Sequence, residues 1–297
     1  MEEYSRTDLA CESRGIASGA ELSSDVYREE HHGAIKISRL NIKTLDEEKM
    51  LGKPRGTYVT VMCGKLWLLG EEMMRQLEEQ LAKELRAMCE GVCGKTMDSG
   101  FSVLVVGLGN SEITVDAIGP FSVRRLNVTR HLRRLDETLY NTVGRCEISA
   151  LLPGVLGQTG IETVELVRGA VDKVKPDVVV AIDALAARSC QRLAATIQLS
   201  DSGINPGSGI GNHRKAINRQ TIGVPVVALG VPTVVNSSTL VYDVLEQAGI
   251  SEMCPSLREI LENGKSFFVS PRESDVITES VSEILANAVD GAFTLSE

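Results

Sequence analysis

Phe101-Ser-Val-Leu-Val-Val106 and Val178-Val-Val-Ala-Ile182 are two short apolar runs that decide the fold class this sequence predicts. Both are β-branched and apolar on both faces, which is typical of central strands of a parallel sheet. The first run is followed by Gly107-Leu-Gly-Asn110 and then by Asp116, whereas the second leads directly into Asp183. Because ligands bind at the carboxyl ends of strands in open α/β sheets, we expect both acids in one crevice. Burying a carboxylate is costly unless it is paired or used, so such a pair indicates acid–base chemistry.

Strand-like and helix-like patterns alternate along most of the remaining chain. Strand formers are concentrated at residues 57–62, 149–152, 196–199 and 224–230, and helical spacing predicts helices over residues 71–88, 237–247 and 275–289. Shorter helices are expected near residues 115–126 and 184–192, and a capping-box spacing predicts another that begins at Thr159 and ends before Pro176.

This alternation predicts an α/β fold of the phosphorylase/hydrolase-like kind, with a mostly parallel central sheet and helices on both faces. Residues 34–69 are rich in strand formers, so we expect them to form a peripheral β-rich edge. Residues 1–33 are polar and show no sustained period, which is typical of a flexible or loosely docked segment.

The composition argues against several classes of protein. The chain has 297 residues, and 31 basic against 40 acidic side chains give a net charge of −9, which is unfavourable for direct nucleic-acid binding. We find no apolar run of about 18 residues and no signal-like amino-terminal pattern, so we expect no membrane span. Seven cysteines without framework or zinc spacing favour reduced thiols in a cytoplasmic protein. We predict no cofactor and no metal site.

Two glycine-rich loops resemble nucleotide-binding motifs but lack parts of them. Glu112 stands where the third glycine of the dinucleotide motif would follow Gly107-Leu-Gly109, and Gly207-Ser-Gly-Ile-Gly211 lacks the Lys-Ser/Thr ending of a phosphate loop. We interpret these loops as turns whose N–H groups approach a substrate carbonyl. The candidates for a substrate groove or an oxyanion site are Gly107, Gly109, Asn110, Gln158, Ser208 and Gly209.

The sequence gives little support for a serine–histidine hydrolase or a zincin. Ser208 does not directly follow a strand, and no His-Glu-x-x-His helix is present. Asp116 and Asp183 remain as candidates. If they lie close together, one keeps a proton and polarises a carbonyl while the other stays ionised and activates water. Each could instead be a helix N-terminal residue bonded to backbone N–H groups, and spacing alone does not decide between these interpretations.

Taken together, the motifs resemble one family, the spore germination protease. This endopeptidase degrades small acid-soluble spore proteins, and it is related to hydrogenase-maturation proteases. The resemblance rests on Arg6-Thr-Asp-Leu-Ala10, Gly107-Leu-Gly-Asn110, Asp116-Ala-Ile-Gly-Pro120, Val128-Thr-Arg-His-Leu132, Pro153-Gly-Val-Leu-Gly-Gln-Thr-Gly-Ile-Glu-Thr163, Lys175-Pro-Asp177, Ala181-Ile-Asp-Ala-Leu-Ala-Ala-Arg188, Thr196-Ile-Gln-Leu-Ser-Asp-Ser-Gly203, Pro206-Gly-Ser-Gly-Ile-Gly-Asn212 and Gly230-Val-Pro-Thr-Val-Val235.

The resemblance implies an atypical aspartic-type endopeptidase in which Asp116 and Asp183 match the proposed catalytic aspartates. It also implies a zymogen that removes its own propeptide, a homotetramer, and a location in the forespore or spore core. Substrate sites of the family resemble Thr-Glu followed by an apolar residue, Ala, Ser and Glu, which Thr7-Asp-Leu-Ala-Cys-Glu12 mimics. We therefore expect cleavage between Asp8 and Leu9, with residues 1–8 as the propeptide and residues 9–297 as a single peptidase domain.

The chain also departs from the family pattern. It looks shorter between Gln247 and the last helix, Asn236 stands where an aspartate is common, and Ser111-Glu112-Ile113 replaces a more usual Trp-Asn-Val. Two alternatives remain open at this stage. One is a metal-dependent maturation-type peptidase on the same fold, with carboxylates and His131 as ligands. The other is a non-catalytic protein that binds spore proteins or a small regulatory molecule.

Overall fold

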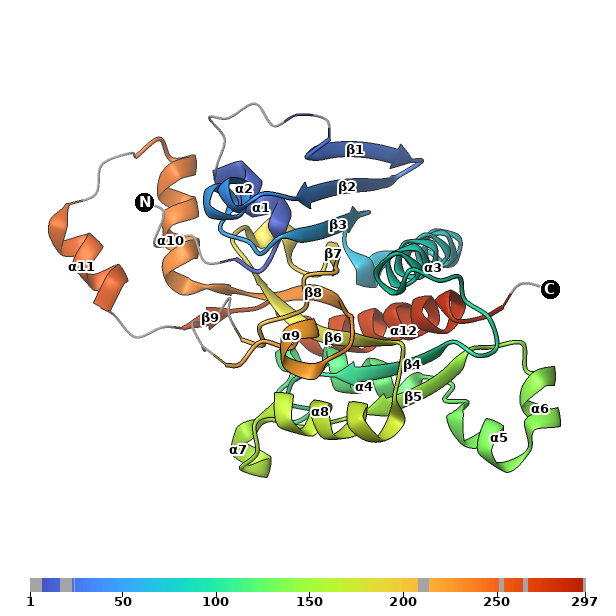
Figure 1. The fold of residues 1–297 in the computed structure, drawn as a ribbon. Helices are drawn as coiled ribbons and strands as arrows, with labels where there is room; N and C mark the ends of the chain where they lie inside the picture. Colours follow the sequence, from blue (N-terminus) through green and yellow to red (C-terminus); the bar gives the residue numbers. More distant parts are fainter. Residues whose placement is uncertain are drawn as a thin grey trace.

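The computed structural model describes residues 7–16, 23, 25–207, 214–250, 254–263 and 267–295. Within these residues one nine-stranded sheet has the order β1-β2-β3-β7-β8-β6-β4-β5, and β9 pairs with β8 (Figure 1). The strands are β1 (Tyr27–His32), β2 (Ile35–Ile42), β3 (Gly56–Met62), β4 (Ser102–Gly107), β5 (Glu147–Leu151), β6 (Val178–Ala187), β7 (Thr196–Ser200), β8 (Val226–Asn236) and β9 (Phe268–Val269).

Helices cover both faces of this sheet. They are α1 (Ala10–Ile16), α2 (Leu45–Leu51), α3 (Glu71–Cys93), α4 (Ile118–Arg125), α5 (Arg130–Leu135), α6 (Glu137–Thr142), α7 (Leu156–Thr159), α8 (Thr163–Val174), α9 (Arg219–Ile222), α10 (Ser237–Gln247), α11 (Pro255–Asn263) and α12 (Ser274–Ala292). Three short 3₁₀ helices complete the described part, namely η2 (Leu66–Leu68), η3 (Thr114–Asp116) and η4 (Cys190–Arg192).

The α/β class is confirmed, but the prediction of a mostly parallel sheet is wrong. Only β5, β4, β6 and β8 form a parallel ladder, whereas β1, β2, β3, β7 and β9 all join antiparallel. The reversal begins after β6, where residues 188–195 lead into β7. A parallel return needs a crossover of a dozen or more residues, so this short connection cannot supply one.

Several predicted elements differ from those observed. The helix expected near residues 184–192 is instead the second half of β6 followed by η4, because β6 pairs with β8 as far as Ala187. The alanines in this segment favour a helix locally, but strand pairing overrides that preference. The helix expected to begin at Thr159 starts at Thr163, since Gly160 at φ +68° ends α7.

The amino-terminal third is more ordered than its composition predicted. Residues 10–16 and 27–32, expected to be flexible or loosely docked, form α1 and β1. The segment expected to be β-rich contains helix α2, which Thr44 and Glu47 start with a capping box. The helices predicted over residues 71–88, 237–247 and 275–289 are confirmed as α3, α10 and α12.

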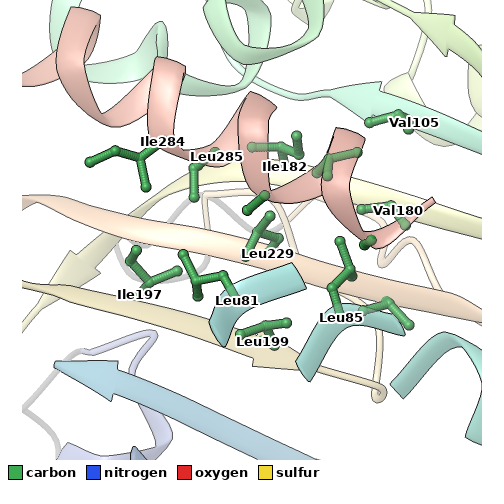
Figure 2. Packing of buried hydrophobic residues seen from close by; sticks show 14 of the residues in the cluster. Leu81, Leu85, Val105, Val180, Ile182, Ile197, Leu199, Leu229, Ile284 and Leu285 are labelled. Atoms are coloured by element: carbon green, nitrogen blue, oxygen red, sulfur yellow. The ribbon is translucent and has the colours of Figure 1, made fainter. Parts of the chain in front are cut away.

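One face of the sheet holds the main hydrophobic core. Figure 2 shows how leucines of α3 and α12 pack on inward-facing residues of β4, β6, β7 and β8. The labelled residues are Leu81, Leu85, Val105, Val180, Ile182, Ile197, Leu199, Leu229, Ile284 and Leu285. Ile182 points into this core, and because strand side chains alternate, Asp183 points to the opposite face.

The opposite face is covered by two separate groups of elements. Helices α8 and α9 pack on β4 and β6 through Val167, Val171 and Ile222. Residues 9–16 and α2 contact the β2–β3 side and the end of β6. Asp183 lies between these two groups. In the described residues, no helix combines the length and the apolar character that crossing a membrane requires.

Candidate active site

Asp183 lies inside strand β6, not after it as the sequence predicted. Its register partner on β8 is Gly230, whose partner on β7 is Gln198. Asp183 and Gln198 therefore lie on either side of Gly230, on one face of the sheet, with backbones about 10 Å apart across two strand spacings. Asp183 is 5% exposed, and its Oδ1 accepts the N–H of Ala184 at 2.9 Å. A helix N-terminal role for this aspartate is therefore wrong.

Asp116 reaches the same place through the loop that follows β4. Leu108 donates its N–H to the carbonyl of Ile182 at 2.8 Å, which fixes the start of this loop beside β6. The loop then folds back, and Asp116 Oδ2 accepts the N–H of Asn110 at 2.8 Å. Asp116 ends η3 directly before helix α4. The Asp116 carboxylate thus closes its own loop, and the loop brings it close to Asp183.

Glycines allow the Asp116 loop and helix α4 to pack closely against strands β4 and β6. A Cβ at Gly107 would lie 2.5 Å from the carbonyl oxygen of Gly119, and one at Gly119 would lie 2.4 Å from that of Ile182. Gly109 has φ +108°, and a Cβ there would lie 2.1 Å from the carbonyl oxygen of Asp116. These contacts explain why positions 107 and 109 are glycines, because a larger residue would clash with the backbone. The close packing positions Asp116 against β6.

The electrostatics show that Asp116 acts on Asp183. Burial raises the pKa of Asp183 well above its ordinary value, and the negative charges of Asp116 and Asp8 raise it further. Burial also raises the pKa of Asp116, against the opposing effects of the Asn110 N–H and the Arg214 guanidinium. Of the two carboxyl groups, Asp183 is therefore the one that keeps its proton to higher pH.

Asn110 and Gln158 lie next to Asp116, whereas the last two candidates cannot be placed. Gln158 donates through Nε2 to Asn110 Oδ1 at 2.9 Å, and the N–H of Asn110 bonds to Asp116. These residues extend the Asp116 loop towards α7. Ser208 and Gly209 fall outside the described residues.

A cavity of about 530 Å³ opens beside Asp183. Its floor includes Gly230, Gln198 and Ser200, all on the same face of the sheet. One wall comes from the α2 side, including Lys53 and Tyr58, and the other from the α9 side, including Asn218 and Arg219. The cavity thus occupies the space between the two groups of elements that cover this face.

The amino-terminal segment runs along this cavity, with the Asp8–Leu9 peptide bond near Asp183. The Asp8 carbonyl oxygen accepts from Gln198 Nε2 at 3.1 Å, and Gln198 Oε1 accepts the N–H of Ala10 at 2.6 Å. Lys53 Nζ donates to the carbonyl of Thr7 at 2.7 Å. One glutamine therefore holds the chain on both sides of the Asp8–Leu9 bond.

Leu9 and Glu12 anchor the segment further along. Leu9 is fully buried against Leu185, Ala187, Leu193 and Val235. The Glu12 carboxylate accepts the N–H of Arg188 at 2.7 Å and that of Ser189 at 2.9 Å. The segment in which cleavage is expected is therefore held by hydrogen bonds and apolar contacts along the cavity that Asp183 lines.

His131, the histidine expected as a ligand in the metal-dependent alternative, does not lie at the cavity with Asp183. His131 is exposed on helix α5, which contacts α6 and β5, and it is not part of the cavity lining. No group of three or more His, Cys, Asp or Glu residues suited to a metal ion occurs in the part of the chain that the structure describes.

Sequence reasoning missed Gln198, Gly230, Lys53 and Arg214. Gln198 and Gly230 stand in quoted motifs, but nothing in the sequence shows that β7 and β8 align them with Asp183. Lys53 and Arg214 lie in segments without a recognisable pattern. The alternation of polar Gln198 and Ser200 with apolar neighbours in β7 was the one available signal of a polar face.

Comparison with known proteins assigns the chain to a family. The sequence model of the family described as germination protease matches residues 8–248. The germination protease of Caldanaerobacter subterraneus subsp. tengcongensis is 40% identical over 96% of this chain and 93% of its own length. That of Priestia megaterium is 42% identical over 83% of this chain and 68% of its own, and that of Bacillus subtilis 40% identical over 81% and 66%.

The matched region includes both aspartates, the Asp8–Leu9 bond and Gln198. The α/β fold of the chain and its alignment with a relative over most of its length agree with this assignment. The chain belongs to the germination protease family, and it is a protease that acts in spore germination.

Proposed function

We propose that this protein is a self-processing endopeptidase in which Asp116 and Asp183 activate water to cleave the Asp8–Leu9 bond. The observation that carries the proposal is the position of this bond. Gln198 holds the Asp8 carbonyl on the floor of the cavity that Asp183 lines, and the Asp8 charge acts on the Asp183 carboxyl. Cleavage here releases residues 1–8 as a propeptide and leaves residues 9–297 as the peptidase domain.

The chemistry follows from the different pKa values of the two acids. Ionised Asp116 takes a proton from a water molecule whose oxygen attacks the Asp8 carbonyl carbon, while protonated Asp183 gives its proton to the carbonyl oxygen. Gln198 Nε2 donates to the same oxygen and stabilises its developing charge. The proton held by Asp116 then passes to the nitrogen of Leu9 as the peptide bond breaks, and one hydroxyl of the tetrahedral intermediate returns a proton to Asp183.

The substrates we propose are small acid-soluble spore proteins, which would use the same site after processing. Support comes from family membership and from the chain's own segment, whose Thr-Asp-Leu-Ala-Cys-Glu sequence resembles the expected substrate pattern. We further propose that the enzyme acts in the spore core as a homotetramer. Size-exclusion chromatography with light scattering tests the assembly, and a monomeric mass would contradict it.

The decisive experiment is an intact-mass time course of the purified full chain over a range of pH. The wild type should lose residues 1–8, whereas Asp116→Asn and Asp183→Asn should remain whole, and Asp46→Asn on exposed α2 is the matched control. Equal cleavage in all four proteins would refute catalysis by the two acids. Loss of cleavage by the wild type when a metal chelator is added would instead favour the metal-dependent alternative.

A further inference from the structure

Lys53 is a cation on the wall of the cavity that the proposed chemistry does not use. It lies in the short connection between α2 and β3, where Gly52 at φ +63° ends the helix and the Tyr58 hydroxyl donates to the carbonyl of Pro54 at 2.7 Å. From this connection the ammonium Nζ donates to the carbonyl of Thr7 at 2.7 Å. Lys53 thus contacts the main chain of the second residue before the bond that we propose is cleaved.

The surroundings of Lys53 make its ammonium depend on the amino-terminal segment. Burial lowers the pKa of Lys53, and the negative charges of Asp8 and Glu12 oppose that fall. A cation withdrawn from water needs hydrogen-bond acceptors or opposite charges in place of the water. The Thr7 carbonyl and the Asp8 carboxylate both belong to residues 1–8, which the proposed processing removes. Processing therefore takes one acceptor and one charge away from Lys53 and leaves its ammonium beside the cavity.

Three successive main-chain groups before the cleaved bond have partners on three different segments of the fold. The Thr7 carbonyl accepts from Lys53 in the connection between α2 and β3. The Asp8 N–H donates to the carbonyl of Ala186 in β6 at 2.8 Å, and the Asp8 carbonyl accepts from Gln198 in β7 at 3.1 Å. All three groups precede helix α1 in the chain. Other peptides carry the same groups, so these contacts do not depend on side chains.

We propose that Lys53 is a positioning residue that binds a main-chain carbonyl of the substrate, an inference that rests on the proposed function. In the unprocessed chain this carbonyl is that of Thr7. Once residues 1–8 have left, the same ammonium binds the carbonyl of the second residue before the cleaved bond in a separate peptide. Since Gln198 and not Lys53 donates to the reacting carbonyl, Lys53 determines which bond lies beside Asp183 and takes no part in breaking it.

The first test changes the carbonyl and leaves the protein as it is. The parent peptide has the sequence of residues 5–15 with Cys11→Ser, and a second peptide carries a thioamide in place of the Thr7 carbonyl. Sulfur accepts hydrogen bonds more weakly than oxygen. The full wild-type chain first completes its own processing, which intact mass verifies. The thioamide peptide should then show a KM at least about threefold higher than the parent, with a similar kcat.

Enzyme variants show whether Lys53 is the group that contacts this carbonyl. Lys53→Met keeps the apolar stem and removes the donor, so KM for the parent peptide should rise about tenfold with little change in kcat. The thioamide should cause no further rise in this variant, since the interaction is already lost. Lys53→Arg keeps a charged donor and should restore part of the affinity. Lys49→Met on the exposed side of α2 is the matched control.

The pH dependence of kcat separates positioning from chemistry. Lys53 is not among the causes that shift the pKa of Asp116 or of Asp183. The acidic and alkaline limits of kcat should therefore be the same in Lys53→Met and in the wild type. A shifted limit would mean that Lys53 acts on the catalytic acids, and it would overturn the positioning role.

The remaining outcomes separate the two proposals. If the wild type cleaves neither itself nor the parent peptide, the proposed function fails and the role of Lys53 fails with it. If the wild type cleaves both, a KM of Lys53→Met within about twofold of wild type would overturn the role of Lys53 alone. An equal thioamide effect in both enzymes would do the same. A folded Lys53→Met chain that never processes would place Lys53 in the chemistry and also overturn positioning. Circular dichroism melting checks that each variant is folded.

Discussion

Asp183 is the residue whose surroundings control the chemistry we propose. Burial and then the charges of Asp116 and Asp8 raise its pKa, and the Ala184 N–H and Arg214 oppose that rise. A protonated Asp183 therefore persists well above the pH at which an ordinary aspartic acid ionises. This explains how an aspartate pair can act outside strongly acidic conditions. Activity should fall at low pH as Asp116 gains a proton and at high pH as Asp183 loses its own.

Asp8→Asn should move the alkaline limb of this profile. Removing the Asp8 charge removes one of the causes that raise the pKa of Asp183, so the proton is lost at lower pH. We expect the alkaline limb of the processing rate to shift to lower pH while the acidic limb stays in place. The measurement is the initial rate of cleavage by mass spectrometry between pH 4 and 9, with Asp46→Asn as control. An unshifted alkaline limb would show that Asp183 does not provide the proton.

Gln198→Glu separates the two roles of the glutamine. The carboxylate can still accept the Ala10 N–H but cannot donate to the Asp8 carbonyl. Losing one donor to a developing oxyanion lowers rates by about 10²–10³-fold. We expect a loss of processing rate of at least this size, and because the new carboxylate is buried, circular dichroism melting checks that the variant is folded. A rate within about threefold of wild type would mean that this hydrogen bond only docks the segment.

At the scale of elements, the site depends on how closely α4 packs on β4 and β6. Gly119→Ala would place a Cβ 2.3 Å from the Leu108 carbonyl oxygen and 2.4 Å from that of Ile182, both backbone atoms. We expect a loss of about 1–3 kcal/mol in the free energy of unfolding together with loss of processing, because the Asp116 loop moves. Gly91→Ala in helix α3 is the control, since nothing lies within 4 Å of the added Cβ and helix propensity should stabilise it. Urea denaturation of both variants measures the difference.

The sequence predicted elements well where local and tertiary preferences agree. The strands around residues 102–106 and 178–182 and the helices α3, α10 and α12 follow from their apolar patterns. The interaction of Asp116 with Asp183 agrees with the expectation that the two acids lie at the same edge of the sheet. The sequence could not predict that β6 continues past Asp183, because the alanines there favour a helix until β8 pairs with them. Nor could the sequence show that β7 pairs antiparallel with β8. The position of Gln198, across Gly230 from Asp183, depends on that pairing.

At the scale of the whole molecule, the amino-terminal segment makes the fold and the site depend on each other. Residues 9–12 close a hydrophobic cluster with β6 and β8 and also bring the Asp8 charge close to a buried acid. Burying Asp183 is a cost that a stable fold could avoid with an amide, so its presence is better explained by chemistry than by stability. The same cost gives the protein a specific dependence of stability on pH.

Asp183→Asn should remove part of that dependence. Below about pH 4, near the ordinary pKa of aspartic acid, Asp183 is protonated in both the folded and the unfolded chain. Above it the unfolded chain has released this proton while the folded chain keeps it, because burial raises the folded-state pKa. The free energy of unfolding therefore falls by up to ~1.4 kcal/mol per pH unit from this group, until the folded-state pKa is reached. Asparagine carries no such proton, so the variant should gain stability relative to wild type as pH rises from 4 to 8. Urea unfolding of both proteins at each pH measures the gap, and a gap that stays constant would show that Asp183 is ionised in the folded protein without cost.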